Sequence, residues 1–247
     1  MKKNILVLFL SVGSWFTAFG QQNEGIVAYD QKINMHKRIT DESMKAMIPE
    51  FRTNKMQLIM RGGESVFKAA EQANEETESA SDNGNGTTMR IVVKAPQSET
   101  YRNSGTQQLI ELRELAGQKF LIEDTLRRSP WKLTGERKKI QGYDCMQAIY
   151  TSKANNQPIV AWFTEAIAVS SGPANYGGLP GLILEVNIND GDMVYLAQKI
   201  EFKKLAEGAL KVPSGGKKIT DAEFTKKRDD YMKEMNMSGG GVRIIRN

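Results

Sequence analysis

Residues 171–183 read Ser171-Gly172-Pro173-Ala174-Asn175-Tyr176-Gly177-Gly178-Leu179-Pro180-Gly181-Leu182-Ile183, the most specific stretch of the chain. Proline fixes φ at the second position of a turn and glycine permits positive φ at the third, so Leu179–Leu182 predicts a type II turn. This turn leads into the apolar run Leu182–Val186, which predicts a strand. A phosphate-binding loop is the alternative, but it requires Lys, Ser or Thr and then a helix after the last glycine. We therefore interpret Gly178–Ile183 as a structural motif.

Short apolar runs separated by turn residues flank this motif on both sides. Their length and their alternation with polar residues are typical of strands in a sandwich-like β protein. The predicted strands are 25–35, 53–61, 89–94, 100–103, 108–112, 119–124, 131–134, 143–152, 159–164, 182–187 and 194–202. The sequence therefore predicts a mainly β protein with a single antiparallel sheet domain.

Two helices are expected in addition. A short N-terminal helix is predicted over Asp41–Ile48, because Pro49 ends it and its methionines share one face. A C-terminal helix is predicted after Pro213, with Asp221 as its cap and with Phe224, Tyr231 and Met235 along one face.

Charge and composition limit the chemistry. The chain has 34 basic and 29 acidic residues, one cysteine and one histidine, so it can form neither an internal disulfide nor a site with several histidines. Residues 203–247 hold 11 of the basic and 6 of the acidic residues, and 213–247 is predicted to be a basic helix and tail. No aromatic residues are interleaved there as a nucleic-acid platform requires, so we expect a solvated helix face and no nucleic-acid partner.

The first twenty residues are typical of a signal peptide. Lys2 and Lys3 precede an apolar run that ends in Ala18-Phe19-Gly20, which predicts cleavage after Gly20. A membrane anchor is the alternative, but polar residues interrupt the run and it is shorter than the ~20 residues that a membrane span requires. We expect the mature domain 21–247 to be periplasmic or secreted, with no transmembrane segment after cleavage.

Residues 69–88 form an acidic insert. They carry five acidic side chains and no Lys or Arg, and they end in Ser-Asp-Asn-Gly-Asn-Gly before the next apolar run. Such a composition buries too little apolar surface to offset the entropy of ordering. We predict a disordered insert that contributes nothing to the core.

The central part of the chain resembles the GLPGLI family of secreted bacterial proteins. The hexapeptide Gly178–Ile183 carries the resemblance, together with Trp131, the Ile140-x-Gly142-Tyr143-x-Cys145 segment, Ala148, Trp162-x-Thr164, Ile167 and Gly172-Pro173. The resemblance covers about 131–202. It implies a distant similarity to the bowl-like β domain that precedes the catalytic part of a secreted peptide N-glycanase, where that domain is non-catalytic. It also implies a bowl-like or half-barrel sheet and partnership with a TonB-dependent outer-membrane receptor or another envelope protein.

From these observations we expect a non-enzymatic cell-envelope protein, a binding or accessory factor for an outer-membrane receptor or for its peptide, glycan or lipid ligand. No catalytic residue, cofactor or metal is assigned. Trp131, Tyr143, Trp162 and Tyr176 could line a concave ligand-binding face, and burial in the core is the alternative. Cys145 lies in a strand-like alternation, which favours a buried thiol over a nucleophile.

Two other functions remain open. His36, Met232, Met235 and Met237 could form a Cu(I) site, because thioethers are soft ligands, although methionines more often fill an irregular core. An unrecognised hydrolase is the other alternative. It would need a pair of carboxylates across a cleft, and Glu165, Glu185, Asp190 and Asp192 are candidates.

Overall fold

The computed structural model describes residues 23–39, 42–46, 48–70, 78–82, 88–92, 98–127, 129–153 and 156–237. The predicted signal peptide 1–20 and the end of the chain beyond Met237 lie outside the described residues. Within the part that is described, no helix is long and apolar enough to cross a membrane.

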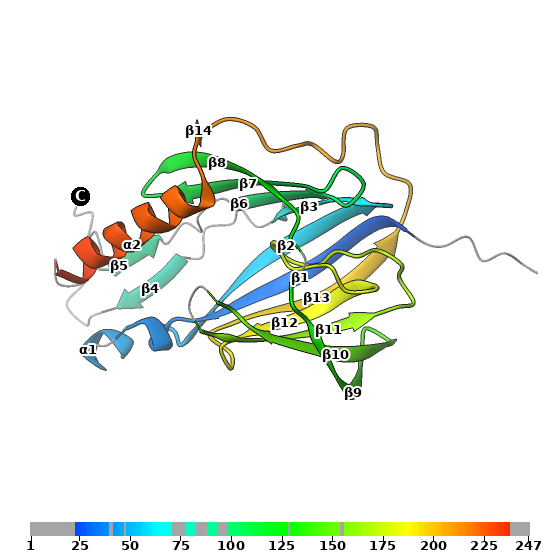
Figure 1. Cartoon of the computed structure of the whole chain (residues 1–247). Helices are drawn as coiled ribbons and strands as arrows, with labels where there is room; N and C mark the ends of the chain where they lie inside the picture. The colour runs from blue at the N-terminus through cyan, green and yellow to red at the C-terminus, as the bar shows by residue number, and fades with distance from the viewer. Residues whose placement is uncertain are drawn as a thin grey trace, which may run out of the picture.

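Strands dominate the structure (Figure 1). They are β1 (Glu24–Asn34), β2 (Phe51–Arg61), β3 (Glu64–Ala69), β4 (Glu78–Asp82), β5 (Thr88–Val92), β6 (Ser98–Asn103), β7 (Gln108–Leu115), β8 (Gln118–Thr125), β9 (Lys132–Ile140), β10 (Tyr143–Thr151), β11 (Pro158–Thr164), β12 (Leu182–Ile188), β13 (Met193–Phe202) and β14 (Lys217–Lys218). Twelve of them form one large sheet in the order β14-β8-β7-β6-β3-β2-β1-β13-β12-β11-β10-β9. The prediction of a mainly β protein is confirmed.

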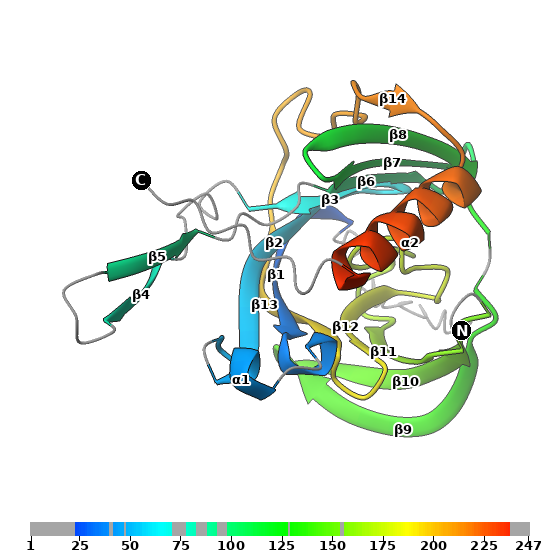
Figure 2. The same ribbon diagram turned by 90° about the vertical axis from the view of Figure 1, so that its left-hand side faces the viewer.

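The sheet consists of two meanders joined at its centre. One meander runs from β1 to β8 and the other from β9 to β13, and β1 pairs antiparallel with β13 from Gly25↔Phe202 to Ile33↔Met193. The sheet is strongly curved, so in Figure 2 its two ends curl toward each other around the C-terminal helix and the loops. This curvature gives the sheet a concave face.

The sheet is mixed, which corrects the prediction of a purely antiparallel one. β14 pairs parallel with β8, with Lys217 opposite Phe120 and Lys218 opposite Leu121. This strand could not be predicted, because its two lysines are exposed and show no apolar alternation. Backbone hydrogen bonds hold β14 against β8 instead, as where Ile219 N donates to Leu121 O at 3.1 Å.

The insert predicted over 69–88 contains a strand. β4 pairs antiparallel with β5 in a separate two-stranded sheet, from Glu78↔Val92 to Asp82↔Thr88. Residues 78–82 are therefore paired with a neighbouring strand within the segment that the sequence predicts to be a disordered insert. The hairpin adds no strand to the large sheet.

The C-terminal helix is confirmed as α2 (Asp221–Met237). Its cap is Thr220 and not the predicted Asp221: Glu223 N donates to Thr220 Oγ1 at 3.2 Å, and Thr220 N donates to a Glu223 carboxylate oxygen at 2.8 Å. This reciprocal pair is a capping box.

The predicted N-terminal helix over 41–48 is not shown. The structure has only the turn-long elements η1 (His36–Arg38) and α1 (Glu42–Lys45) in this region. A segment this short does not support a helical hydrogen-bond ladder of its own.

Both faces of the sheet are covered. On the concave face, the ring of Phe67 lies edge-on to Tyr29 and Tyr195, with centroids 6.0 and 5.8 Å apart, at the centre of the main core. On the convex face of the β3–β8 half, a second cluster that includes Tyr101 and Leu112 packs against Leu210. The face of α2 that packs against the sheet contributes Phe224. Its ring lies edge-on to that of Phe120, with centroids 5.8 Å apart.

Candidate functional site

The connection between β11 and β12, residues 165–181, crosses the concave face of the sheet (Figure 2). Its apolar residues Ile167, Val169 and Leu179 are buried in the main core. Backbone hydrogen bonds fix it to β12, since Leu182 N donates to Ile167 O and Ile183 N donates to Ser171 O. The connection therefore packs on the concave face of the sheet as part of the main core.

Gly181 allows the connection to enter β12. Its φ is +155°, and a Cβ there would lie 2.1 Å from the carbonyl oxygen of Thr164. Its amide donates to Leu179 O at 2.8 Å, a tighter turn than the predicted type II turn, in which Leu182 would donate to Leu179. The predicted type II turn is therefore wrong, because its hydrogen bond from Leu182 to Leu179 is replaced by one from Gly181. Gly181 is required instead because the backbone of Thr164 passes close to it.

Arg102 lies beneath this connection. It is 8% exposed, and its Nη1 donates to Asn175 O at 2.6 Å. A Cβ on Gly177 would lie 2.5 Å from its Nη2, so the glycine allows the guanidinium to pass close to the backbone. Burial lowers the pKa of Arg102 to about 10, partly opposed by Glu111, so the side chain stays charged at neutral pH.

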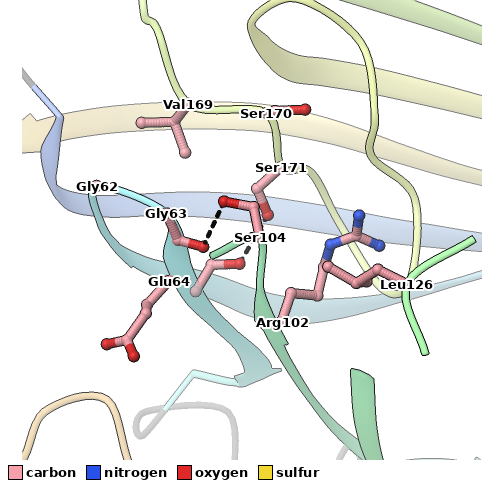
Figure 3. Close-up of a pocket in the computed structure, with 10 residues that line it drawn as sticks. Gly62, Gly63, Glu64, Arg102, Ser104, Leu126, Val169, Ser170 and Ser171 are labelled. Carbon is pink, nitrogen blue, oxygen red and sulfur yellow. Dashed lines mark hydrogen bonds between the residues drawn. The ribbon is translucent and has the colours of Figure 1, made fainter. Parts of the chain in front are cut away.

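A small cavity of about 20 Å³ opens beside Arg102 (Figure 3). Its polar lining comes from serines on both sides: Ser65 and Ser171 share a hydrogen bond of 2.7 Å, and Ser104 Oγ donates to Gly63 O at 3.2 Å. The Glu64 carboxylate points away from the cavity, and it accepts hydrogen bonds from Tyr101 and Asn103 instead. The cavity therefore presents one cation and several hydroxyl groups.

A second charged group lies farther along the same face, beside α2. Glu111 is 7% exposed, and it accepts a hydrogen bond of 2.6 Å from Arg113 Nη2. Arg113 also donates to Asp221 at 3.0 Å and lies 5.2 Å from the ring centroid of Phe224. Burial raises the pKa of Glu111, Arg113 opposes the shift, Asp221 adds to it, and Arg102 opposes it.

Position in the sheet explains why these side chains share one face. β6 and β7 pair with Thr100 opposite Glu111, and β3 and β6 pair with Ser65 opposite Arg102. Alternate residues of a strand point to the same side, so Ser65, Arg102 and Glu111 all face the concavity. A buried carboxyl with a raised pKa, next to cations, is suited to proton transfer.

A larger hollow of about 390 Å³ lies beside β10 and β11. Tyr150, Ile149 and Pro158 give it a mainly apolar wall, and Lys132 is its only ionisable lining group besides the tyrosine among the described residues. The hollow can accept an apolar or ring-shaped group, but it has no carboxyl group for acid–base chemistry.

The four aromatic residues predicted to line a ligand site are all partly buried against the main core. Trp131 Nε1 donates to Gly177 O at 3.0 Å, and its ring lies edge-on to Tyr150 at 4.6 Å. Lys138 Nζ sits 4.3 Å from the ring centroid of Trp162. Burial raises the pKa of Tyr176, as expected for a phenol surrounded by protein. Tyr143 also packs at the edge of this core, and a ligand-lining role for the four stays a prediction.

The remaining predicted groups are the candidates for a copper site and Cys145. His36 Nε2 lies 2.8 Å from Ile48 O, and Met232 is 52% exposed on α2. The side chains of Met235 and Met237 lie outside the described residues, so the copper site stays a prediction. Cys145 is 1% exposed and burial raises its pKa to about 11, which agrees with a buried thiol.

The carboxylates proposed for a hydrolase are held in other ways. Glu185 binds Lys138 at 2.6 Å, and Asp192 binds Lys37 at 2.8 Å. Asp190 lies in the turn between β12 and β13 with a φ of +51°, and Glu165 is exposed at the end of β11. Glu111, Arg102 and Arg113 were not predicted from the sequence. Their alternation with Tyr101, Ile110 and Leu112 is visible in the sequence, but it is also typical of a solvent-exposed face.

The fold defines a class of protein, a curved β bowl, that occurs in known structures. PNGF-II, solved in space groups P21 and C2, matches with TM-scores of 0.55 at 14% and 16% identity. Each match covers 83% of this chain and 33% or 32% of the solved one, so the chain spans about a third of their length. At this identity the likeness establishes the fold. No curated protein matches the sequence.

The sequence also matches the family model described as "N-glycanase peptide, N-terminal domain" over residues 74–225, more than half of the chain. The chain therefore belongs to this family.

This finding corrects two expectations. Membership of the GLPGLI family is wrong, because the matching family is that of the N-glycanase domain, even though Gly178–Ile183 is present. The expectation of a non-catalytic accessory protein is contradicted as well, because the matching family is named for an N-glycanase, which is an enzyme. The hydrolase alternative is closer to these findings.

Proposed function

We propose that this protein acts in the hydrolysis of N-linked glycans, that the concave face of its sheet contacts the glycan-bearing substrate, and that Glu111 serves there as a proton donor. The observation that carries the proposal is Glu111 itself, a buried carboxyl with a raised pKa on the concave face of a chain from an N-glycanase family.

The surroundings of Glu111 suit a general acid. Hydrolysis adds water across the bond to the leaving nitrogen, so the hydroxyl goes to carbon and a proton goes to nitrogen. Burial raises the pKa of the Glu111 carboxyl, so it holds its proton to a higher pH than an exposed glutamate does. Once Glu111 has given it up, Arg113 at 2.6 Å stabilises the resulting carboxylate, and water restores the proton.

Access to this group is through the side next to α2. The side chain of Glu111 is only 9% exposed, but Arg113 and Asp221 are 23% and 54% exposed, so the ion-paired group reaches the surface. Sugar hydroxyls are hydrogen-bonding groups, and exposed guanidinium and carboxylate groups bind them well. The apolar hollow beside Tyr150 offers a second surface for a sugar ring.

The predicted signal peptide over residues 1–20 supports action in the periplasm or outside the cell. An exported protein would meet glycoproteins there. Partnership with a TonB-dependent receptor stays a prediction.

The test is release of free glycan from a glycopeptide by the purified chain. Glu111→Gln keeps the shape and hydrogen-bonding capacity of the side chain but cannot donate the proton, so the rate should fall by about 10²–10⁴-fold. Glu136→Gln, which removes an exposed carboxylate from β9, is the matched control and should release glycan at the parent rate. Absence of glycan release by the parent, or equal rates for parent and Glu111→Gln, would contradict the proposal.

A further inference from the structure

Arg102 carries a buried charge with incomplete pairing. Taken over the described residues, its one hydrogen bond is Nη1 to Asn175 O, and no carboxylate lies within ion-pair distance of it. The nearest acidic group that affects it is Glu111, which is itself bound by Arg113. A buried guanidinium has five donors, and leaving them unmatched is costly.

The cavity beside Arg102 is built from hydrogen-bonding groups. Ser65 and Ser171 are 2% and 4% exposed, and their hydroxyls face each other at 2.7 Å at one side of it. Ser104 and Ser170 are exposed and lie at its rim. In Figure 3 the side chain of Glu64 turns outward, so no carboxylate of the drawn residues points into the space.

The size of the cavity limits what it holds. A volume of about 20 Å³ accommodates about one or two water-sized groups. Such a space fits the oxygens of a small planar anion but excludes a sugar ring, which would have to remain outside the rim.

We propose that this cavity is a carboxylate-binding site, in which the Arg102 guanidinium and the free hydroxyl proton of the Ser65–Ser171 pair bind one carboxylate group, with Ser104 at the rim. A carboxylate matches the planar fork of arginine, and it supplies acceptors both for the free guanidinium donors and for this hydroxyl. Gly177 makes the position possible, because any side chain there would meet the guanidinium.

This site is separate from the proton donor that the proposed function assigns. Glu111 lies beside α2 and Arg102 lies beneath the β11–β12 connection, so failure of the glycan-release test leaves the carboxylate site unaffected. A free acid and an acidic sugar both present the same group. The experiment compares them directly.

The test is titration of the folded chain with sodium formate. Binding is monitored by the side-chain NMR signal of Arg102 and by the melting temperature, and sodium chloride at equal ionic strength is the control. We expect a saturable shift of the signal and a rise in melting temperature of about 3–6 °C at formate concentrations ten times the dissociation constant. Methyl glucuronide is the second ligand. Tighter binding of glucuronide assigns the site to acidic sugars, and tighter binding of formate assigns it to free acids.

Two variants decide the outcome. Ser104→Leu fills the rim of the cavity and should abolish the formate effect, whereas Ser214→Leu, at an exposed serine remote from the cavity, should retain it. Arg102→Lys keeps the charge but loses the planar fork, so formate should bind at least tenfold more weakly. Equal responses to formate and chloride in the parent, or an unchanged formate effect in Ser104→Leu, would overturn the proposal.

Discussion

Replacing Gly181 by alanine tests whether the connection on the concave face is fixed by close backbone approach. At a φ of +155° a residue with a Cβ is strained by about 1–3 kcal/mol. The new Cβ would also lie 2.1 Å from Thr164 O, which is backbone and cannot turn aside. Displacing it adds about 1–3 kcal/mol, as for other overpacked sites, so we expect a total loss of about 2–6 kcal/mol.

Gly178 is the matched control, because its φ of +83° also disfavours a side chain but its missing Cβ has no atom within 4 Å. Gly178→Ala should therefore lose only about 1–2 kcal/mol. Urea unfolding followed by tryptophan fluorescence measures both, with the midpoint moving and the slope unchanged. If Gly181→Ala is no less stable than Gly178→Ala, the close approach to Thr164 is wrong and so is the position of the connection.

Two further predictions concern Glu111 and the insert. The pKa of Glu111 is higher in the folded state than in the unfolded state, where it has the ordinary value of 4.5. The stability that its protonation contributes is therefore present at low pH and should be lost as pH rises through the raised pKa. Glu111→Gln should remove that dependence, and Glu136→Gln should keep it; identical pH profiles of unfolding free energy for parent and Glu111→Gln would contradict it. Deleting residues 72–86 should change the melting temperature by less than about 2 °C, because β4 belongs to a separate sheet, as differential scanning calorimetry can check. Loss of cooperative unfolding in this deletion would mean that the insert supports the large sheet.

The strands with regular alternation could be predicted from the sequence. The expected 25–35 and 182–187 match β1 (Glu24–Asn34) and β12 (Leu182–Ile188) to within a residue at each end. β3 was missed because Ser65, Val66 and Phe67 are buried in succession, since β3 has the core on one side and the Leu210 segment on the other. A strand covered on both faces does not alternate.

The site could not be predicted, because it depends on contacts far apart in the sequence. Glu111 and Arg113 alternate with Ile110 and Leu112, which a single sequence presents as a polar outer face. They become a buried pair only because α2, over one hundred residues later, brings Asp221 and Phe224 against them. The pairing of β1 with β13, which joins the two meanders of the sheet, is similarly remote along the chain.

Mapping a bound glycopeptide by backbone NMR tests the central claim most directly. Addition of an N-glycosylated peptide to the labelled chain should shift amide signals on the concave face, including those of Arg102, Glu111 and Arg113, and the same peptide without its glycan should shift them much less. The signal of Leu210, on the convex side, should stay in place. Shifts confined to the convex side, or no difference between the glycosylated and bare peptides, would contradict a glycan-directed role for the concave face.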